Sequence, residues 1–447
     1  MARPIPRLAP VIRATRPSHA PMPVLLAAAR CAEPIQLDRS VRRTQCARQR
    51  TVALLDYRPA VTEPARQLIE RARTLSALLA RHGEEAERLR QPHDDVIRAL
   101  REAGIFELMV PRCFGGLELD LDTFLEVGLA LAEGDASMAW VTTFYIEHNW
   151  MICQFPEAFQ REIFSDRTHV LAPASVSPAG QARPEGDGFV LSGRWKWGTG
   201  VVHADWVMVS AMVTGPDDAP AVPRLFALPR DAVTVEDTWY VDGMAGTGSH
   251  DIVIEEARVP SERSADFLAM VNGRATGARI HEGPLYRTPM IPILALAASM
   301  PAVGQARAAV RAFRDRLADR ILFGTPGIRQ ADKPAAQIRL ARAEIEARQA
   351  ELLMRDVVAE VMALRERATV ADRIRWTASL ACAVDASKRI LQSIGEASGA
   401  SAHFLSHPLQ RSLRDVNVMA CHVVFDLDQR LEMHGRAMLG LEAAGIA

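Results

Sequence analysis

The chain has 447 residues, two to three times the length of a typical domain, which predicts a large core divided among two or three subdomains. It is 49% hydrophobic and 24% charged, with a formal net charge of -1 at pH 7. These values are ordinary for a globular protein. They exclude a peptide hormone and offer no basic surplus for binding nucleic acid.

The charge is unevenly distributed along the chain. Residues 1–50 contain ten arginines and only Glu33 and Asp38, a balance of +8, which leaves -9 for the remainder. We therefore expect residues 1–60 to be a disordered extension rich in Arg and Pro, or the product of a misplaced start codon. A targeting peptide is the less favoured alternative, because arginine greatly outnumbers lysine throughout the chain and not only in this segment.

Neither a membrane span nor a disulfide framework is expected. The longest apolar stretch, about 14 residues from Ile291, is interrupted by Pro301 and is shorter than the roughly 20 residues that cross a bilayer. The six cysteines are scattered without a CxxC pair, so a reducing cytoplasm is the inferred compartment.

Helical periodicity predicts an α-helical domain over residues 61–167. Apolar residues recur at three- and four-residue spacing in residues 61–91, and Pro92 precedes the acidic first turn of a second helix. Residues 121–155 supply two more helices, broken near Gly134.

Short β-rich runs separated by Gly, Pro and Asp predict a central β domain over residues 168–275, an antiparallel sheet or small barrel. Trp195 and Trp197 alternate with charged residues, so both are expected on one face of a strand. Aromatic residues on such a face usually pack in a core, and the alternative is a wall for a flat aromatic cofactor.

Helical periodicity returns in residues 276–447. Four long amphipathic segments favour an antiparallel four-helix bundle, over residues 300–319, 333–366, 370–394 and 407–440. The predicted fold class is therefore α+β, mainly α, in the order helices, sheet and bundle.

Motifs for several common chemistries are missing. No GxGxxG follows a strand, and GxxxxGK[ST], GxSxG and HExxH do not occur. The sequence therefore lacks the motifs of nucleotide-binding folds, P-loop proteins, hydrolases and zinc proteases. The glycine-rich segment at Gly243 has the wrong spacing for a phosphate loop and predicts a tight turn between strands. No metal site is expected, because His422 and His434 are too far apart on the predicted helix to bind one ion.

Histidines are candidate acid–base groups, although local context does not select among them. The candidates are His148, His203, His250, His281, His403, His407, His422 and His434.

The order of elements and four motifs resemble the acyl-CoA dehydrogenase superfamily, from about Val61 to Gly440. The motifs are PRCFGGLELDLDTFLEVGLALAEGDASMAW, WGTGVVHADW, DGMAGTGSHDIVIEEARVP and HPLQRSLRDV. The resemblance implies the acyl-CoA dehydrogenase-like fold. In the dehydrogenases a Glu base often stands seven or eight residues after the Arg-Asp pair of the last motif. Here that place reads Cys421-His422-Val423 and has no carboxylate.

With His422 in that place, the segments YIEHNW around His148 and GPLYR around Pro284 are similar to the two-component (group D) flavin-dependent monooxygenases of this superfamily. The resemblance implies an oxygenase component that receives reduced FMN from a separate NAD(P)H:flavin reductase, with FAD as an alternative. Reaction of the flavin with O2 to give a flavin hydroperoxide would then hydroxylate an aromatic, phenolic substrate.

Site residues are carried over by position. The resemblance implies a catalytic set of His422, His148, Thr199 and Ser175. Thr199, where relatives commonly carry Ser, would face flavin nitrogen 5, and His422 would lie near the peroxide or the substrate hydroxyl. His148 and Ser175 would contact the substrate, and His148 is a plausible base toward a phenol because its usual pKa lies near neutrality.

The flavin itself would be held by further residues. Trp197 is implied as a wall of the flavin ring, beside Thr199. Arg320 and the pair Ser398-Gly399 are weaker candidates for the phosphate, which guanidinium groups and free backbone amides bind well. The alternative is that Arg320 is an exposed charge on a helix surface and does not bind the flavin.

Other functions and one assembly stay open. They are an acyl-CoA dehydrogenase-like enzyme with tightly bound FAD and a different carboxylate, an N- or S-oxygenase of the same branch, and a non-catalytic scaffold. A homotetramer is implied by the resemblance alone, since bundle helices in this fold commonly pair across subunits.

Overall fold

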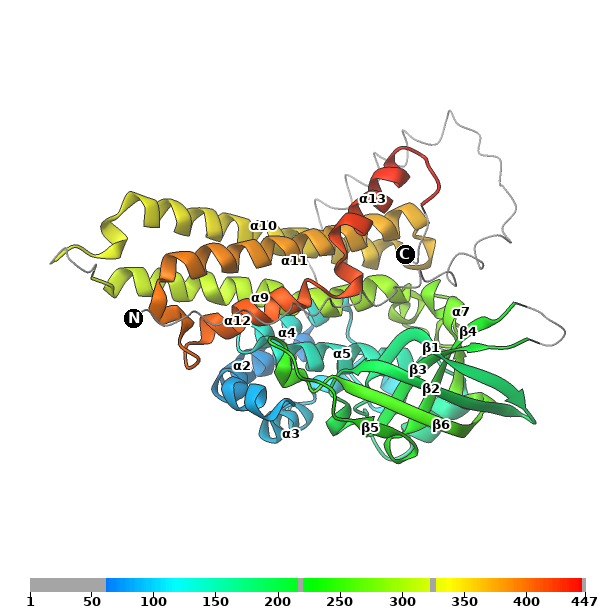
Figure 1. Cartoon of the computed structure of the whole chain (residues 1–447). Helices are drawn as coiled ribbons and strands as arrows, with labels where there is room; N and C mark the ends of the chain where they lie inside the picture. The colour runs from blue at the N-terminus through cyan, green and yellow to red at the C-terminus, as the bar shows by residue number, and fades with distance from the viewer. Residues whose placement is uncertain (1–61, 216–219, 322–326, 444–447) are drawn as a thin grey trace, which may run out of the picture.

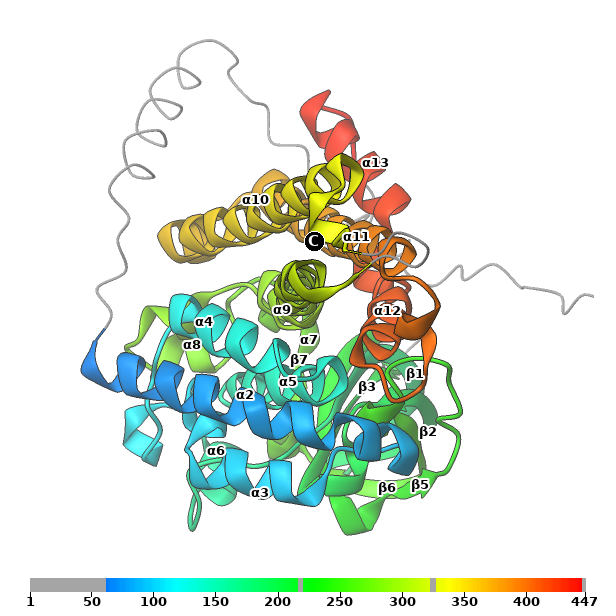
Figure 2. The ribbon, with the colours of Figure 1, turned by 90° about the vertical axis from the view of Figure 1, so that its left-hand side faces the viewer.

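The computed structural model describes residues 62–215, 220–321 and 327–443 (Figure 1). The predicted N-terminal extension lies outside these residues. Figures 1 and 2 show helices packed against one side of a twisted sheet. The longest helices run across both these helices and the sheet.

Within the described residues, five α-helices precede the sheet. Side chains of Thr62, His93, Asp120 and Asp135 cap the first four by accepting backbone N–H bonds, which explains where these helices begin. Every residue of α5 is buried, so this helix is at the centre of the molecule. The helices are α2 (Glu63–Leu89), α3 (Asp94–Glu102), α4 (Leu121–Ala132), α5 (Ala136–Ile152) and α6 (Glu157–Ile163).

One seven-stranded sheet follows, in the order β5-β6-β2-β1-β3-β4-β7. All neighbouring strands are antiparallel except β1 and β3, which are parallel. The sheet has its own apolar cluster, which includes Leu191, Trp195, Phe226 and Ile252. The strands are β1 (Ala174–Glu185), β2 (Gly188–Gly198), β3 (Trp206–Val213), β4 (Val222–Pro229), β5 (Thr234–Glu236), β6 (His250–Pro260) and β7 (Ser264–Asp266).

The prediction that Trp195 and Trp197 share one face is wrong. Trp195 is 0% exposed, and its indole N–H donates to the carbonyl of Ser210 at 2.7 Å, whereas Trp197 is 61% exposed. The register between β2 and β6 shifts between Trp195 and Gly198, and Trp197 has a φ of +68°. A bulge of this kind reverses the alternation of side chains for the residues beyond it.

The second helical part begins with two short helices, and three long helices then lie side by side (Figure 2). The elements are α7 (Phe267–Val271), α8 (Gly277–Ile280), α9 (Met290–Asp319), α10 (Pro334–Leu364), α11 (Val370–Ser398), α12 (Pro408–Met419) and α13 (Leu427–Met438).

The predicted helix over residues 407–440 is in fact two helices. α12 ends at Met419, and the carboxylate of Asp426 accepts the N–H of Gln429 as the cap of α13. A capping Asp starts a new helix because it satisfies N–H groups that have no partner in the first turn. His422 therefore lies in a break between helices rather than on a continuous helix.

The apolar stretch from Ile291 belongs to α9. Pro301 in this helix has no N–H to give to the carbonyl of Ala297, and the Thr143 hydroxyl of α5 donates to that carbonyl at 2.9 Å instead. By length and composition α9 would be able to cross a membrane, but 89% of its most apolar window is buried inside the protein. It is a core helix.

Helices from before and after the sheet share one apolar core. This cluster includes Phe106 and Tyr145 from the first part, and Met300 and Trp376 from the second. The candidate site lies where α5 of this core meets the sheet and the break between α12 and α13.

Candidate functional site

One face of α5 carries a row of aromatic rings with a histidine at each end. The His422 ring lies 5.5 Å from Trp140, Trp140 lies 4.9 Å from Phe144, and Phe144 lies 5.4 Å from His148, measured between ring centroids. The three α5 residues are four positions apart, which places them on one face of a helix. The structure thus joins two of the predicted site residues through a continuous aromatic surface.

His148 is almost fully buried. Its Nδ1 lies 2.7 Å from the carbonyl oxygen of Ala172, which fixes the proton on Nδ1 and leaves a lone pair on Nε2 in the neutral ring. Burial lowers the pKa of His148 to about 3, against the opposing effect of the Ala172 hydrogen bond. By itself this imidazole is therefore a poor proton acceptor near neutral pH.

Glu147, the residue before His148, is also completely buried. One carboxyl oxygen lies 3.3 Å from His148 Nε2, and neither oxygen has a hydrogen-bond partner in the described part of the chain. Burial raises its pKa well above the usual value for a carboxyl.

His422 lies in the break after α12 and is partly buried. Its Nδ1 accepts the backbone N–H of Val424 at 3.3 Å, so the neutral ring carries its proton on Nε2. Burial, together with the positive charge of Arg430, lowers the pKa of His422 to about 4. The ring is therefore a neutral hydrogen-bond donor at neutral pH.

The corner after β2 contains a chain of three hydroxyl groups. The Thr199 hydroxyl lies 3.1 Å from that of Ser249, which lies 2.7 Å from that of Thr247. Gly200 adopts a φ of +73°, and its carbonyl accepts the Tyr145 hydroxyl of α5 at 2.5 Å. A Cβ at Gly200 would lie 2.4 Å from the Tyr145 oxygen, so a glycine is needed for α5 to approach this corner.

Ser175 lies next to the backbone of Lys196, the residue before Trp197. Ser175 Oγ is 3.4 Å from the Lys196 carbonyl, a long contact that leaves the hydroxyl available to other partners. Trp197 is the only one of the seven tryptophans, all of them within the described residues, that is exposed. An exposed tryptophan next to a glycine-lined hydroxyl corner fits the wall of a flat, partly polar ring.

Arg320, Ser398 and Gly399 form a separate group. Arg320 Nη1 donates to the Ser398 carbonyl at 2.8 Å, and Gly399 has a φ of +69°. Arg320 follows the last residue of α9, and Figure 1 shows this end of α9 at the end of the bundle away from the sheet. Among the described residues no contact joins this group to Thr199 or Trp197.

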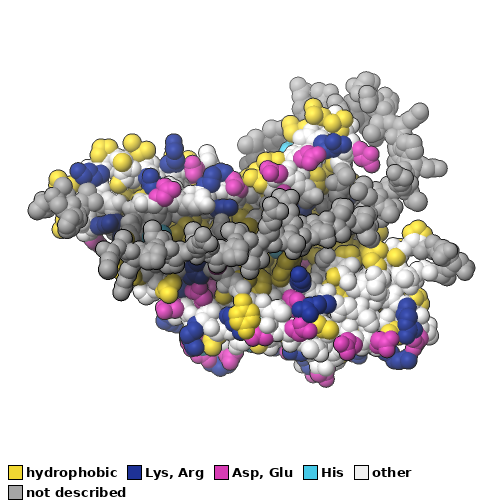
Figure 3. Space-filling model, in the orientation of Figure 1, with side chains coloured by type: hydrophobic (Ala, Val, Ile, Leu, Met, Phe, Trp, Pro, Cys, Tyr) yellow, Lys and Arg dark blue, Asp and Glu magenta, His cyan; other side chains and the backbone are white. Residues whose placement is uncertain are grey.

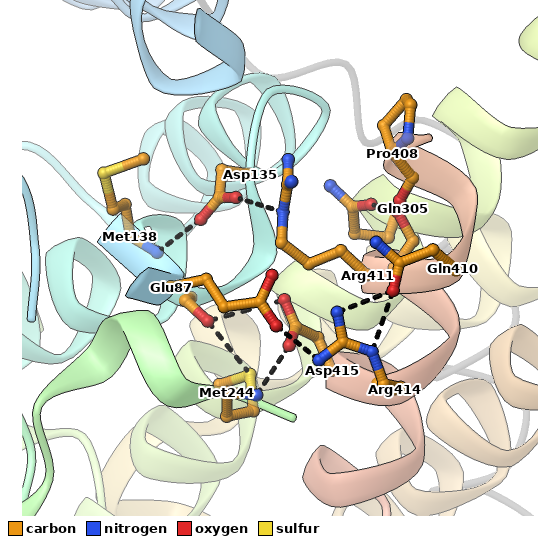
Figure 4. Close-up of polar contacts among 12 residues, drawn as sticks. Glu87, Asp135, Met138, Met244, Gln305, Pro408, Gln410, Arg411, Arg414 and Asp415 are labelled. Atoms are coloured by element: carbon orange, nitrogen blue, oxygen red, sulfur yellow. Dashed lines mark hydrogen bonds and ion pairs between the residues drawn. The ribbon is translucent and has the colours of Figure 1, made fainter. Parts of the chain in front are cut away.

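The motif HPLQRSLRDV of α12 holds the surrounding elements together (Figure 4). Arg411 lies 3.3 Å from the carboxylate of Asp135, which caps α5. Arg414 binds Glu87 of α2, and Asp415 accepts the N–H of Met244 at 2.5 Å. The glycine-rich segment is the expected turn, and it carries Thr247 of the hydroxyl chain, so α12 fixes the Thr199 corner indirectly.

Asp415 has an unusual environment for a carboxyl. Burial, followed by the negative charge of Asp135, raises the pKa of Asp415 to about 7. Ser137 of α5 also lies 3.4 Å from it.

One cluster in the described residues brings three side chains of metal-ligating type together. Ligand atoms of His82, His93 and Asp95 lie within 4.8 Å of one another. The two imidazole rings face each other with centroids 3.9 Å apart and planes tilted by 31°. Lone pairs lie in the plane of an imidazole, so two nearly parallel rings do not aim them at a common point. We assign no metal to this cluster.

Sequence reasoning did not identify Glu147, Ser249 or Asp415 as parts of the site. Glu147 carries the only full charge in the α5 sequence, and a single acid in an otherwise apolar and polar-neutral helix was the available signal. Ser249 and Thr247 gave no such signal, because their alignment with Thr199 comes from pairing of β2 with β6.

The comparisons with known proteins agree with this geometry. Residues 296–427 match the family described as acyl-CoA dehydrogenase, C-terminal domain. A pigment production hydroxylase from Rhodococcus is 34% identical over 84% of this chain and 97% of the relative. The FADH(2)-dependent resorcinol hydroxylase, oxygenase component, from Rhizobium is 31% identical over 87% of this chain and 97% of the relative.

A solved structure gives the same result. The crystal structure of 3-HSA hydroxylase from Rhodococcus superposes with a TM-score of 0.81 at 29% identity, covering 85% of this chain and 98% of the other. The fold is that of acyl-CoA dehydrogenase-like monooxygenases, which confirms the predicted fold class. The chain belongs to the oxygenase components of two-component flavin-dependent monooxygenases. The acyl-CoA dehydrogenase activity considered above is not favoured.

Proposed function

We propose that this protein hydroxylates a phenolic aromatic substrate with O2 and reduced flavin. The observation that carries the proposal is the aromatic row on α5, which ends in two neutral histidines, on the same helix whose Tyr145 hydroxyl binds Gly200 of the Thr199 corner. Aromatic rings with neutral polar groups at both ends of the row are suited to contact a flat substrate that carries a hydroxyl group. The resorcinol hydroxylase among the relatives supports the same substrate class.

Reduced flavin supplies the activation of O2 in this proposal. Thr199 would hydrogen-bond the ring through a hydroxyl whose orientation is set by Ser249, and exposed Trp197 would cover one side. His422 would donate its Nε2 proton to an oxygen near the ring, since its Nδ1 is already occupied by Val424. The buried rings of Trp140 and Phe144 would keep water from the His422 side of the site.

On the substrate side, His148 and Ser175 would contact the phenol. His148 presents only Nε2, because Nδ1 is held by Ala172. A base here increases the electron density of the aromatic ring by removing the phenol proton, which favours transfer of an electrophilic oxygen.

FMN and FAD are both candidates for the flavin. FMN follows from the resemblance of the sequence, whereas the Rhizobium relative is named as FADH(2)-dependent. The affinity of the protein for each reduced flavin, measured under anaerobic conditions, distinguishes them. A separate NAD(P)H:flavin reductase would supply either one in the cytoplasm, where the four described cysteines would stay free thiols.

We place the flavin phosphate at Arg320, Ser398 and Gly399 of a second copy of the chain. Among the described residues no contact joins this group to the Thr199 corner, and Arg320 follows the end of α9 that lies away from the sheet, so a flavin held by both groups would cross an interface between two copies. Exposed Ile338, Ile345 and Leu352 recur every seven residues on α10, a spacing suited to helix pairing. Figure 3 shows hydrophobic side chains among the charged ones on this side of the molecule. We propose a homotetramer built on such contacts.

The test is a coupled reaction of purified protein with NADH, a flavin reductase, flavin, O2 and resorcinol. We expect a hydroxylated product and little hydrogen peroxide. Thr199→Val keeps the volume but removes the hydroxyl, so the product formed per flavin oxidised should fall roughly 10–100-fold. Thr199→Ser restores the hydroxyl and is the matched control. Absence of hydroxylation across a panel of phenols, or product formed without O2 uptake, would refute the proposal.

A further inference from the structure

Two adjacent buried ionisable groups on α5 are left without the partners that buried charges normally have. Glu147 is 0% exposed and His148 is 2% exposed. His148 Nε2 and a Glu147 carboxyl oxygen are 3.3 Å apart, close enough for an ion pair but not in hydrogen-bond geometry. Buried polar groups are nearly always hydrogen-bonded, so an unsatisfied carboxyl calls for a functional explanation.

The described surroundings provide no other charge for this pair. Burial is the sole cause of the raised pKa of Glu147, and only burial and the Ala172 carbonyl act on His148. The buried first part of α9, residues 290–306, contains no charged residue, and its Ala297 carbonyl accepts the Thr143 hydroxyl of α5. Near the start of β1, Arg101 and Asp205 pair with each other at 2.9 Å. Among the residues that the structure describes, each member of the pair is therefore the one charge partner of the other.

We infer that Glu147 is a positioning residue that enables His148 to accept the phenol proton. This inference rests on the proposed function of the site. An imidazole in an apolar environment resists becoming a cation unless a negative charge lies beside it. The Glu147 carboxylate, next to Nε2, supplies that charge at the nitrogen that takes up the proton.

The proton transfer balances without any further reactant. The substrate O–H bond breaks, its electron pair stays on the phenolate oxygen, and an Nε2–H bond forms on His148. The Glu147 carboxylate and the imidazole become a carboxylate and an imidazolium, and the substrate carries the new negative charge. Nδ1 takes no part, because its proton is held by the Ala172 carbonyl at 2.7 Å.

A dependence on pH follows from this scheme. Two strongly interacting sites titrate together, and at low pH the pair holds one shared proton. The active form has lost that proton, so hydroxylation of a phenol should rise with pH through the apparent pKa of the pair. Without Glu147, His148 is neutral throughout the neutral range and has no ionisation there to produce this rise.

The test compares Glu147→Gln with wild type in the coupled reaction with resorcinol, at a series of pH values. We expect Glu147→Gln to form about tenfold less product per flavin oxidised. Flavin oxidation itself should stay within about twofold, because the lost product appears as hydrogen peroxide. The rise with pH seen in wild type should be absent. Glu126→Gln, a partly buried acid paired with Arg355 on α10, is the matched control and should behave as wild type.

Glu147→Asp keeps a carboxyl and should retain the rise with pH, displaced along the pH axis, so the inference does not depend on one variant. A rise with pH that is unchanged in Glu147→Gln would overturn it. An unchanged amount of product per flavin oxidised in that variant would also overturn it. Failure of the wild-type protein to hydroxylate any phenol would instead overturn the proposed function.

A second measurement needs no flavin. A nitrophenol is coloured as the phenolate and nearly colourless as the phenol, so its absorbance reports its ionisation when it is bound. We expect wild type to bind it with a lowered pKa, and Glu147→Gln to lose most of that shift while still binding. Equal shifts in the two proteins would contradict a role for Glu147 in the proton transfer.

Discussion

Two buried polar clusters lie on opposite ends of α5, and they differ in how their charges are matched. At the N-terminus, Asp135 pairs with Arg411, and Asp415 accepts a backbone N–H from Met244. Toward the C-terminus, Glu147 and His148 have no charged partner among the described residues except each other, and only His148 has a hydrogen bond, to the Ala172 carbonyl. Matched charges hold elements in place, whereas unmatched ones stay available for a ligand.

The difference separates two kinds of motif in this chain. HPLQRSLRDV is the more easily noticed, yet its charged residues bind other parts of the same chain. YIEHNW contains Glu147 and His148, and packing alone does not explain why the Glu147 carboxyl is buried without a hydrogen bond. Removing a charge should therefore cost stability at the first cluster and activity at the second.

The largest expected effect is that of Arg411→Met. The substitution leaves the carboxylate of Asp135 buried without its partner, and such changes cost about 3–5 kcal/mol. Denaturation by urea, monitored by circular dichroism, measures the loss. Arg389→Met removes an exposed pair with Asp385 and serves as the control, with little change expected. A similar stability for both variants would show that the buried pair is not structural.

Asp415→Asn tests the same cluster through pH. The folded-state pKa of about 7 lies above the usual carboxyl value, so the folded protein binds this proton more tightly than the unfolded chain. Stability due to this group is therefore greatest at low pH, falls as the pH rises from about 4 to 7, and is level above that.

The Asn variant keeps an acceptor for Met244 but cannot ionise. Its free energy of unfolding should lose a dependence on pH worth a few kcal/mol, on the order of that pKa difference. Urea titrations of both proteins between about pH 5 and 8 measure it. Identical pH profiles would mean that Asp415 is not the group that titrates in this range.

The smallest effect has the opposite sign. Glu147→Met replaces an unsatisfied buried carboxyl with an apolar side chain of similar length. We expect the free energy of unfolding to rise by about 1–2 kcal/mol, because no hydrogen bond is lost and a desolvation cost is removed. The same urea titration measures it. A loss of stability comparable to that of Arg411→Met would show that both clusters stabilise the fold.

The order of elements was predictable because periodicity and turn composition are local. Helices before the sheet and a bundle after it follow from spacing alone, and the resemblance identified the family. The face of the sheet on which Trp197 lies was not predictable, since the positive φ of this one residue reverses the alternation of side chains along the strand. Neither was the break at His422, which depends on a cap at Asp426 inside a sequence that otherwise continues as a helix.

The candidate site was partly predictable. His148, His422 and Thr199 are brought to the surroundings of α5, as the resemblance implied, although their roles stay predictions. The burial of His148, which makes it a weak base alone, depends on packing from several parts of the chain. The role that we infer for Glu147 depends on its distance to His148 Nε2, which the sequence does not give.

The shared core of the helices has a consequence for synthesis in the cell. Apolar residues of α4 and α5 pack against α9, whereas the sheet between them in sequence has a separate cluster. During translation the first helices leave the ribosome long before α9 exists, so the apolar faces that they bury against α9 have no partner until late in synthesis. We expect the sheet to mature first, and the helical half to remain open to chaperones until the chain is almost complete.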